Sequence, residues 1–421
     1  MDHENCLGIL LTKKGAEIYI KKLIGEGATS IVYLALDKDK KEYAVKLYKD
    51  SESYLNEASR LRNLTSSKYI VKLISYGQGH LERGYSYNSY KLFKNFDADK
   101  VNYSIFEYLK NGELHNYIFL LKKRLSEEIS RKIFFDLVKA VETCHKNGIS
   151  HGDIKLQNIL LNSNFNIKLI DFGFAKNIKD GLISEITGTR FYNAPEMFCC
   201  ATKGYDGVMA DIFSLGVCLF ILVMGFYPFD KPNITDSRYK FISKKDYPGF
   251  WKKCEQKFSS NSSFSGTSHE FKDLFEKMVA YRPKERININ EIKKHSWLKE
   301  LVKNYGDYEQ DEKIENIGDK KKSLSPKKFK NLSHNSSFNK NKKDNFNLEI
   351  KSSFSEGFHH THLNKNNFFT IYDNKDDNAN EHKNNYPNNK IKEFENKYFK
   401  ELSLRKNAID EILKEQEDDA D

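Results

Sequence analysis

Several features that would mark other classes of protein are missing from this sequence of 421 residues. Its six cysteines form no CxxC pair, and no histidines cluster at the spacing of metal ligands. This pattern argues against a disulfide scaffold or a zinc site, and it favours reduced, mostly buried thiols in an intracellular protein. The C-terminal region has no DxDxDG loop, so direct calcium sensing is not expected.

Membrane signals are also scarce. The first four residues are polar, so we expect no signal peptide, and Asp2 is incompatible with N-myristoylation. The longest apolar run, 212–226, is shorter than the roughly 20 residues that cross a bilayer, and Gly216 interrupts it. We therefore predict a buried helix there, no membrane span, and a cytoplasmic protein.

Hydrophobic residues make up only 39% of the chain, and they are unevenly distributed. Up to about residue 300, apolar residues recur at the spacings of strands and helices, whereas Asn, Lys, Ser and Asp dominate beyond it. The formal net charge of +10 arises within the first 300 residues, because the remainder is near neutral. We expect a folded domain that meets phosphates or acidic partners, and no DNA or RNA binding.

The first chemically informative stretch is 23–35, LIGEGATSIVYLA. Its apolar residues alternate around two glycines, which predicts a strand, a tight turn and a second strand. Gly25 and Gly27 have no Cβ, so the backbone N–H groups beside them can approach an anion closely. An ordinary hairpin has the same pattern, and Ser30 stands at the third glycine position of a GxGxxG run. The stretch therefore needs support from other motifs.

A charged residue, Lys46, interrupts the strand-like run 43–47. A lone lysine in a strand commonly faces solvent. Glu57, however, follows in a run with the apolar spacing of a helix. A lysine that grips the α- and β-phosphates of a nucleotide needs an acidic partner to hold it in place, and Glu57 can supply that charge.

The most informative stretch is 149–162, ISHGDIKLQNILLN, which is followed by IKLIDFG at 167–173. Its polar residues alternate with apolar ones, so each is attached to a buried scaffold. Phosphoryl transfer requires an oriented hydroxyl, metal-binding oxygens and cations against the phosphates. This set is provided by Asp153, Lys155, Asn158 and Asp171. A polar turn between two buried strands is the alternative interpretation.

With these motifs the chain resembles a eukaryotic protein kinase over residues 18–300. Other landmarks follow in that family's order: a hinge-like run at 106–109, an activation-segment end at 188–196, the start of a central helix at 211–216, Arg286, and HSWL at 295–298. The resemblance implies an α+β fold of two lobes. We expect a small antiparallel sheet of five strands with one helix over 18–108, a mainly helical lobe over 109–300, and ATP in the cleft between them.

The resemblance also implies roles for the site residues. Asp153 accepts or orients the proton of the substrate hydroxyl, Lys155 steadies the γ-phosphate, and Lys46 binds the α- and β-phosphates. Asn158 and Asp171 hold Mg²⁺. The other nucleotide contacts come from the glycine-rich strands and the hinge, at Gly25, Gly27, Ser30, Val32, Ala44, Glu107 and Leu109.

Two features resemble serine/threonine kinases rather than tyrosine kinases: Lys155 two residues after Asp153, and Thr189 shortly before Tyr192. The expected function is transfer of the γ-phosphate of Mg-ATP to Ser/Thr hydroxyls of protein substrates in intracellular signalling. The runs 205–216 and 227–230 are most similar to the calcium/calmodulin-dependent kinase-like branch. A pseudokinase scaffold is the rival interpretation, and a protein whose tail mainly directs targeting is a second.

The chain departs from the family pattern at Gly152, which replaces the arginine of His-Arg-Asp. That arginine commonly pairs with an activation-loop phosphate, so we expect activity without such phosphorylation, although Ser184 and Thr187 are reasonable phosphosites. Gln157 stands where kinases selective for basic peptides often carry Glu, so no basic substrate motif is predicted. The segment 80–100 is longer than usual and is expected to be a surface loop.

The region after the domain has two parts. Residues 301–388 form a low-complexity, Asn- and Lys-rich segment that cannot bury enough apolar surface to fold, so we predict disorder. Its basic run 320–330 is a solvated stretch, a nuclear-localisation signal or a phosphate-binding patch. Apolar residues between 389 and 418 have the spacing of an amphipathic helix, which is expected to dock on the kinase domain or a partner, to form a short coiled coil, or to be marginal.

Overall fold

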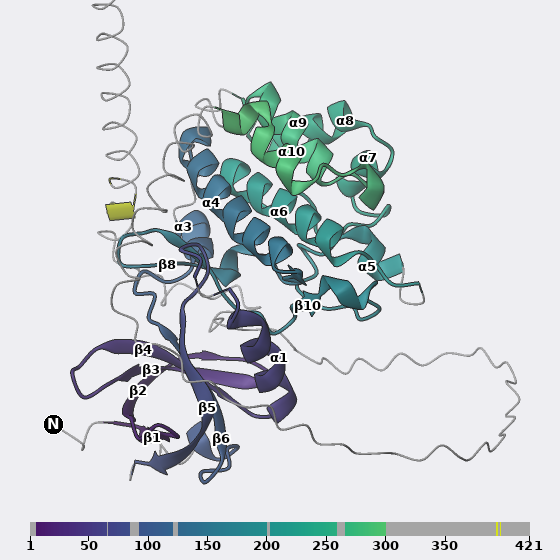
Figure 1. Cartoon of the computed structure of the whole chain (residues 1–421). Coiled ribbons are helices and arrows are strands. Elements are labelled where there is room, and N and C mark those ends of the chain that lie inside the picture. Colours follow the sequence, from purple (N-terminus) through teal and green to yellow (C-terminus); the bar gives the residue numbers. More distant parts are fainter. Residues whose placement is uncertain are drawn as a thin grey trace, which may run out of the picture. The chain divides into compact units, whose positions relative to one another are not determined.

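The computed structural model describes residues 6–64, 66–84, 92–120, 125–199, 203–258 and 266–299, together with 393, 394 and 396. Along the chain, a strand-rich lobe is followed by a helical lobe (Figure 1). The predicted disorder of 301–388 and most of the predicted helix at 389–418 fall outside the described residues.

The first lobe is a closed antiparallel barrel of six strands in the order β1-β2-β3-β4-β6-β5. Its strands are β1 Gly8–Thr12, β2 Glu17–Glu26, β3 Ser30–Leu36, β4 Glu42–Tyr48, β5 Leu73–Arg83 and β6 Val101–Glu107. The five strands expected over 18–108 correspond to β2 to β6, and the structure adds β1, which lies before residue 18, pairs with both β2 and β5 and closes the sheet. Leu10 of β1 is fully buried in the barrel, and closure leaves no unpaired sheet edge.

The barrel is filled by apolar side chains from alternate positions along its strands. Phe93 and Phe96 belong to the same core, with exposures of 0% and 5%, and the ring of Phe93 lies 5.2 Å from that of Tyr33. The expectation that 80–100 is only a surface loop is therefore wrong. Strand β5 continues to Arg83, and the connection to β6 contributes two aromatic side chains to the core.

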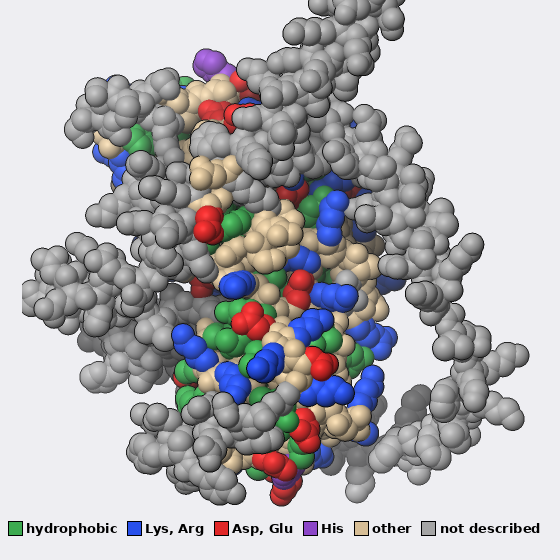
Figure 2. Space-filling model, turned by 90° about the vertical axis from the view of Figure 1, so that its left-hand side faces the viewer, with side chains coloured by type: hydrophobic (Ala, Val, Ile, Leu, Met, Phe, Trp, Pro, Cys, Tyr) green, Lys and Arg blue, Asp and Glu red, His purple; other side chains and the backbone are tan. Residues whose placement is uncertain are grey.

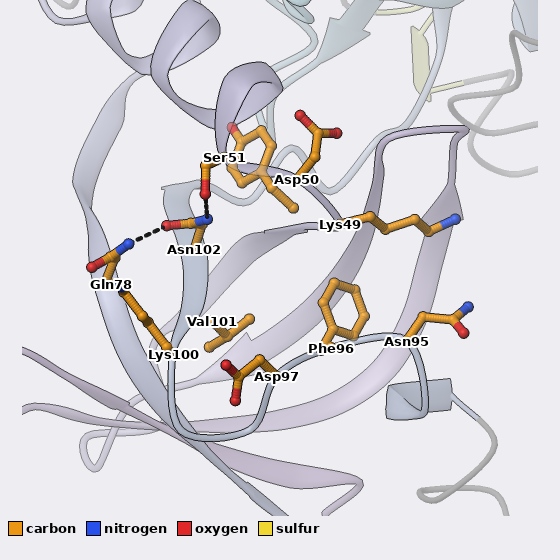
Figure 3. Close-up of a pocket in the computed structure, with 11 residues that line it drawn as sticks. Lys49, Asp50, Ser51, Gln78, Asn95, Phe96, Asp97, Lys100, Val101 and Asn102 are labelled. Carbon is orange, nitrogen blue, oxygen red and sulfur yellow. Dashed lines mark hydrogen bonds between the residues drawn. The ribbon is translucent and has the colours of Figure 1, made fainter.

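Helix α1, Ser51–Leu61, packs against the barrel and carries Glu57. Asn102 of β6 donates to the Ser51 hydroxyl at 3.0 Å and accepts from Gln78 of β5 at 3.0 Å (Figure 3). These side chains line a pocket between the start of α1 and the barrel, whose lining carries charges of both signs. The hydrogen bonds tie the first turn of α1 to two strands, so the barrel fixes the position from which Glu57 extends.

The second lobe is built around α4, Glu127–Lys146, and α6, Gly207–Met224, which run side by side in Figure 1. The other helices are α3 Leu114–Leu120, α5 Pro195–Cys199, α7 Tyr239–Ser243, α8 Tyr247–Glu255, α9 His269–Met278 and α10 Ile289–Lys294. Two small antiparallel sheets pair β7 Ile149–Ser150 with β10 Lys176–Asn177, and β8 Ile159–Leu161 with β9 Ile167–Leu169. The predicted catalytic motifs lie in the loops beside these two sheets.

Helix α6 is the predicted apolar helix, and it ends at Gly225, which adopts the left-handed conformation with φ of 76°. Among the described residues it is the one helix long and apolar enough to cross a membrane. However, 89% of that stretch is buried inside the protein. A buried core helix meets the same criteria of length and composition, so this is weak evidence for a membrane span.

Candidate active site

Strand pairing places four of the predicted nucleotide-binding residues on one face of the barrel. Val32 of β3 lies opposite Lys46 of β4, and Gly25 of β2 lies opposite Val32. Side chains alternate along a strand, so Ala44 shares the face of Lys46. The structure thus brings together residues from three strands that are separate in the sequence.

The glycine-rich turn joins β2 to β3. The N–H of Gly27 donates to the Ser30 carbonyl at 2.8 Å, and the Gly27 carbonyl accepts from Lys49 Nζ at 2.9 Å. The Ser30 side chain is fully buried, and its hydroxyl has no hydrogen-bond partner in the described part of the chain.

Lys46 lies in a buried cluster of charges from both lobes. Its Nζ is 2.5 Å from Glu57 Oε2 and 3.3 Å from Asp171 Oδ1. Burial alone would lower the pKa of Lys46, but the two carboxylates raise it above its usual value. Burial would raise the pKa of Asp171, but Lys46 and Lys155 lower it. The cluster therefore holds a lysine cation beside an ionised aspartate.

Asp171 follows β9 with a backbone φ of 60°, which is uncommon for a residue other than glycine. The next residue, Phe172, is fully buried, and its ring lies 4.8 Å from that of His151. This packing holds the backbone at Asp171 in place. A strained conformation that is maintained by its surroundings is typical of functional sites.

The loop that carries Asp153 is fixed from α6. The Asp211 carboxylate accepts from the backbone N–H groups of His151 at 2.8 Å and Gly152 at 3.0 Å. The His151 ring accepts from the Asp153 N–H at 3.2 Å through Nδ1, which leaves Nε2 to donate to the Ile170 carbonyl at 3.0 Å. These bonds set the direction of the chain on both sides of Asp153.

Asp153 is 4% exposed, and donors surround its carboxylate. The Thr189 hydroxyl donates to Oδ1 at 2.9 Å, and Lys155 Nζ lies 2.9 Å from Oδ2. Asn158 Nδ2 donates to Oδ2 at 3.0 Å. Lys155 also donates to the Thr189 hydroxyl at 2.8 Å. Two of the predicted catalytic residues, Asp153 and Lys155, thus meet the predicted metal ligand Asn158 at one point, and Thr189 joins them.

The amide oxygen of Asn158 fits a metal ion. Asn158 is fully buried, and its Nδ2 donates to the carbonyl and the side chain of Asp153, whereas Oδ1 has no hydrogen-bond partner among the described residues. A buried acceptor without a donor is costly, and a bound cation would satisfy it. With the ionised carboxylate of Asp171, it provides the oxygen ligands that Mg²⁺ prefers.

The predicted hinge leads out of β6. The Glu107 side chain accepts from the Lys72 N–H at 2.8 Å and pairs with Lys168 Nζ at 2.8 Å. Leu109 is buried, and its carbonyl accepts from the Gly112 N–H at 3.2 Å. The Glu107 side chain therefore has a structural role, and the adenine contact expected here would come from the backbone.

Sequence reasoning missed Glu113, a carboxyl group shortly after the hinge. Glu113 is 4% exposed, and its backbone forms a bridge to Leu160 of β8. Burial raises the pKa of Glu113 to about 8, although Lys155 opposes that shift. No spacing rule separates this glutamate from a solvated one. The contacts of Thr189 were also not predicted, because the sequence marks it only as a family feature.

Comparison with known proteins identifies the fold. The protein kinase domain family matches residues 18–298. CBL-interacting protein kinase 11 of Oryza sativa subsp. japonica is 32% identical over 287 residues, which cover 67% of this chain and 51% of that protein. CBL-interacting serine/threonine-protein kinase 12 of Arabidopsis thaliana is 33% identical over 303 residues, 71% of this chain and 56% of that protein.

Serine/threonine-protein kinase SIK1 of Rattus norvegicus is 31% identical over 281 residues, which cover 66% of this chain and 32% of that protein. The chain thus spans about half the length of the two plant relatives and about a third of SIK1. The predicted two-lobed fold is confirmed by the family match. The chain belongs to the protein kinase family, and its domain is of the serine/threonine type, which uses ATP with Mg²⁺.

Proposed function

We propose that the whole protein is a serine/threonine kinase of intracellular signalling that phosphorylates other proteins. The observation that supports this best is the arrangement of Asp153, Lys155 and Thr189, in which two donors hold the carboxylate in a fixed direction. Fixed charges and dipoles that need no reorganisation are the main source of catalysis in phosphoryl transfer.

Each residue has a distinct task in this proposal. Asp153 would orient the substrate hydroxyl and accept its proton, and Lys155 would place positive charge against the γ-phosphoryl group. Lys46, held by Glu57, would bind the α- and β-phosphates. Mg²⁺, held by Asn158 and Asp171, would supply the remaining positive charge against the phosphates.

The test of this function is transfer of labelled phosphate from Mg-ATP to a mixture of proteins, followed by phosphoamino-acid analysis. We expect phosphoserine and phosphothreonine. Phosphotyrosine as the main product would contradict the assignment. ATP binding without transfer would favour the pseudokinase interpretation. The assembled charge cluster of Lys46, Glu57 and Asp171 argues against that interpretation.

Thr189→Val is expected to lower kcat by about tenfold or more, because it removes a hydroxyl that contacts two charged groups. Thr189→Ser is the matched control, because it retains the hydroxyl and should keep most of the activity. The two variants are compared by steady-state kinetics after their melting temperatures have been shown to be similar. A valine variant with the wild-type kcat would show that these hydrogen bonds do not contribute to catalysis.

We also propose that activity does not depend on activation-loop phosphorylation. Gly152 has no side chain to bind a phosphate. In the loop, Glu185 instead pairs with Lys176 at 2.8 Å, which lowers the pKa of Glu185, and Ile183 forms a backbone bridge to Tyr205. Phosphatase treatment is therefore expected to leave kcat unchanged. Loss of activity that Thr187→Glu restores would overturn this proposal.

The location and further partners are proposals as well. We propose that the protein is cytoplasmic and that the basic run 320–330 can direct it to the nucleus. We also propose that the predicted helix at 389–418 binds a partner. On the described surface visible in Figure 2, Lys and Arg side chains are interspersed with Asp and Glu, which is consistent with the expectation of no nucleic-acid binding. Imaging of a fluorescent fusion with and without residues 302–421 tests the targeting role.

A further inference from the structure

A side chain from the C-terminal region is buried against the helical lobe. Phe394 is 0% exposed, whereas Glu393 and Asn396 are exposed, and all three have helical backbone. A helix that buries an aromatic residue between exposed polar residues presents one face to a surface. These residues lie within the helix predicted for 389–418.

The surface that receives Phe394 includes two aromatic residues, Tyr117 of α3 and Phe165, which we call the aromatic cradle. The ring of Phe394 lies 4.8 Å from that of Tyr117 and 6.0 Å from that of Phe165. The two cradle rings are 6.2 Å apart and perpendicular. Such separations, between about 4.5 and 7 Å, are those of favourable aromatic pairs.

Phe165 occupies an unusual backbone conformation. This is an independent indication that its side chain has a role in the aromatic cradle. It has a φ of 57° in the turn between β8 and β9. Bulky residues rarely adopt this conformation, whereas asparagine tolerates it, and the same turn has asparagine at 162, 164 and 166. A strained residue that persists where an unstrained one would serve suggests a function.

The cradle is also connected to Asn111, in the linker that follows the hinge 106–109 and leads from β6 to α3. The Tyr117 hydroxyl donates to the Asn111 carbonyl at 2.9 Å, and the Asn111 side chain donates to the Asn162 carbonyl at 2.8 Å. The Asn111 N–H donates to the Leu161 carbonyl at 3.1 Å. The two rings that contact Phe394, those of Tyr117 and Phe165, belong neither to the loop of Asp153 nor to the Lys46 cluster.

We propose that the segment around Phe394 docks on the aromatic cradle of its own chain and thereby ties the C-terminal region to the helical lobe beside the linker. The occupant is this segment, because its ring fills the cradle. Covalent connection to the domain gives it an effective concentration of about millimolar, which favours docking within one chain over docking between chains.

Hydrogen–deuterium exchange on the full-length chain tests the docking. Phe394→Ala is expected to accelerate exchange at 114–120, 162–167 and 393–396 by about tenfold, and Phe368→Ala, a matched change elsewhere in the C-terminal region, should not. Protection that is independent of protein concentration supports docking within one chain. Protection that falls on dilution would assign the occupant to a second copy, and equal exchange in wild type and Phe394→Ala would exclude docking; either result overturns the proposal.

Phe165→Asn separates docking from folding. Asparagine suits the positive φ, which offsets part of the packing lost with the buried ring, so the melting temperature should fall only slightly, while exchange at 393–396 should rise as it does for Phe394→Ala. A labelled peptide of residues 389–418 should bind the full-length Phe394→Ala chain at least about tenfold more tightly than wild type, whose cradle is occupied. Equal binding to both chains, or unchanged protection in Phe165→Asn, would overturn the proposal.

Discussion

Asp153→Asn is expected to reduce phosphate transfer by about 10²- to 10⁴-fold. The substitution retains the shape of the side chain but removes the charge that would accept the proton of the substrate hydroxyl. It also replaces one of the two carboxylate oxygens by an amide N–H₂ group, which then faces either the donor at Oδ1, Thr189, or the donors at Oδ2, Lys155 and Asn158. The measurement is kcat with Mg-ATP and a generic protein substrate, together with the Kd for ATP, which should change little.

The matched control for this variant is Asp39→Asn. Asp39 is exposed in the turn between β3 and β4 and should retain wild-type kcat. Equal transfer by wild type and Asp153→Asn would contradict the assignment of Asp153. Transfer lost together with ATP binding would point to a folding defect, which a thermal melt would reveal.

Arg286→Ala is expected to lower the free energy of unfolding by about 3–5 kcal/mol, as for other broken buried ion pairs. The Arg286 side chain is 0% exposed and holds Glu196 with two hydrogen bonds of 2.6 and 2.7 Å. It also donates to the carbonyls of Ala280 and Met209, each at 2.9 Å. The substitution leaves a carboxylate that is only 9% exposed and two carbonyls without this partner, which is why the expected effect is large.

Denaturant unfolding of Arg286→Ala and Lys277→Ala measures this difference. Lys277 pairs with Asp273 at 2.8 Å, but both side chains are about half exposed. Solvent screens such a pair, so we expect a loss of only about 0–1 kcal/mol. Similar losses in the two variants would show that the Glu196–Arg286 pair is not a main tie of the helical lobe.

The part of the site that was predictable is local in the sequence. Asp153, Lys155 and Asn158 lie within six consecutive residues, and Asp171 follows one short hairpin later. Backbone geometry therefore restricts where these side chains can lie. The pairing of Lys46 with Glu57 was predictable for another reason, since a buried lysine needs an opposite charge and few acidic residues have a suitable position.

The features that were missed depend on contacts between distant segments. Strand β1 closes the barrel only because β5 is long enough to pair with it, and Phe93 is buried only because the closed barrel needs filling. Glu113 is buried by its position between the linker and β8. Neither helical nor strand periodicity in the sequence carries this information.

By itself, the sequence determined the kinase family, the order of the two lobes and the identity of the charged groups for phosphoryl transfer, because each depends on residue types at short, fixed spacings. Only the tertiary structure decided the closure of the barrel by β1, the hydroxyl bridge of Thr189 to Asp153 and the burial of Phe394. Those features depend on contacts between segments that are distant in the sequence and come together only after folding. Many sequences with the same local pattern would form different contacts.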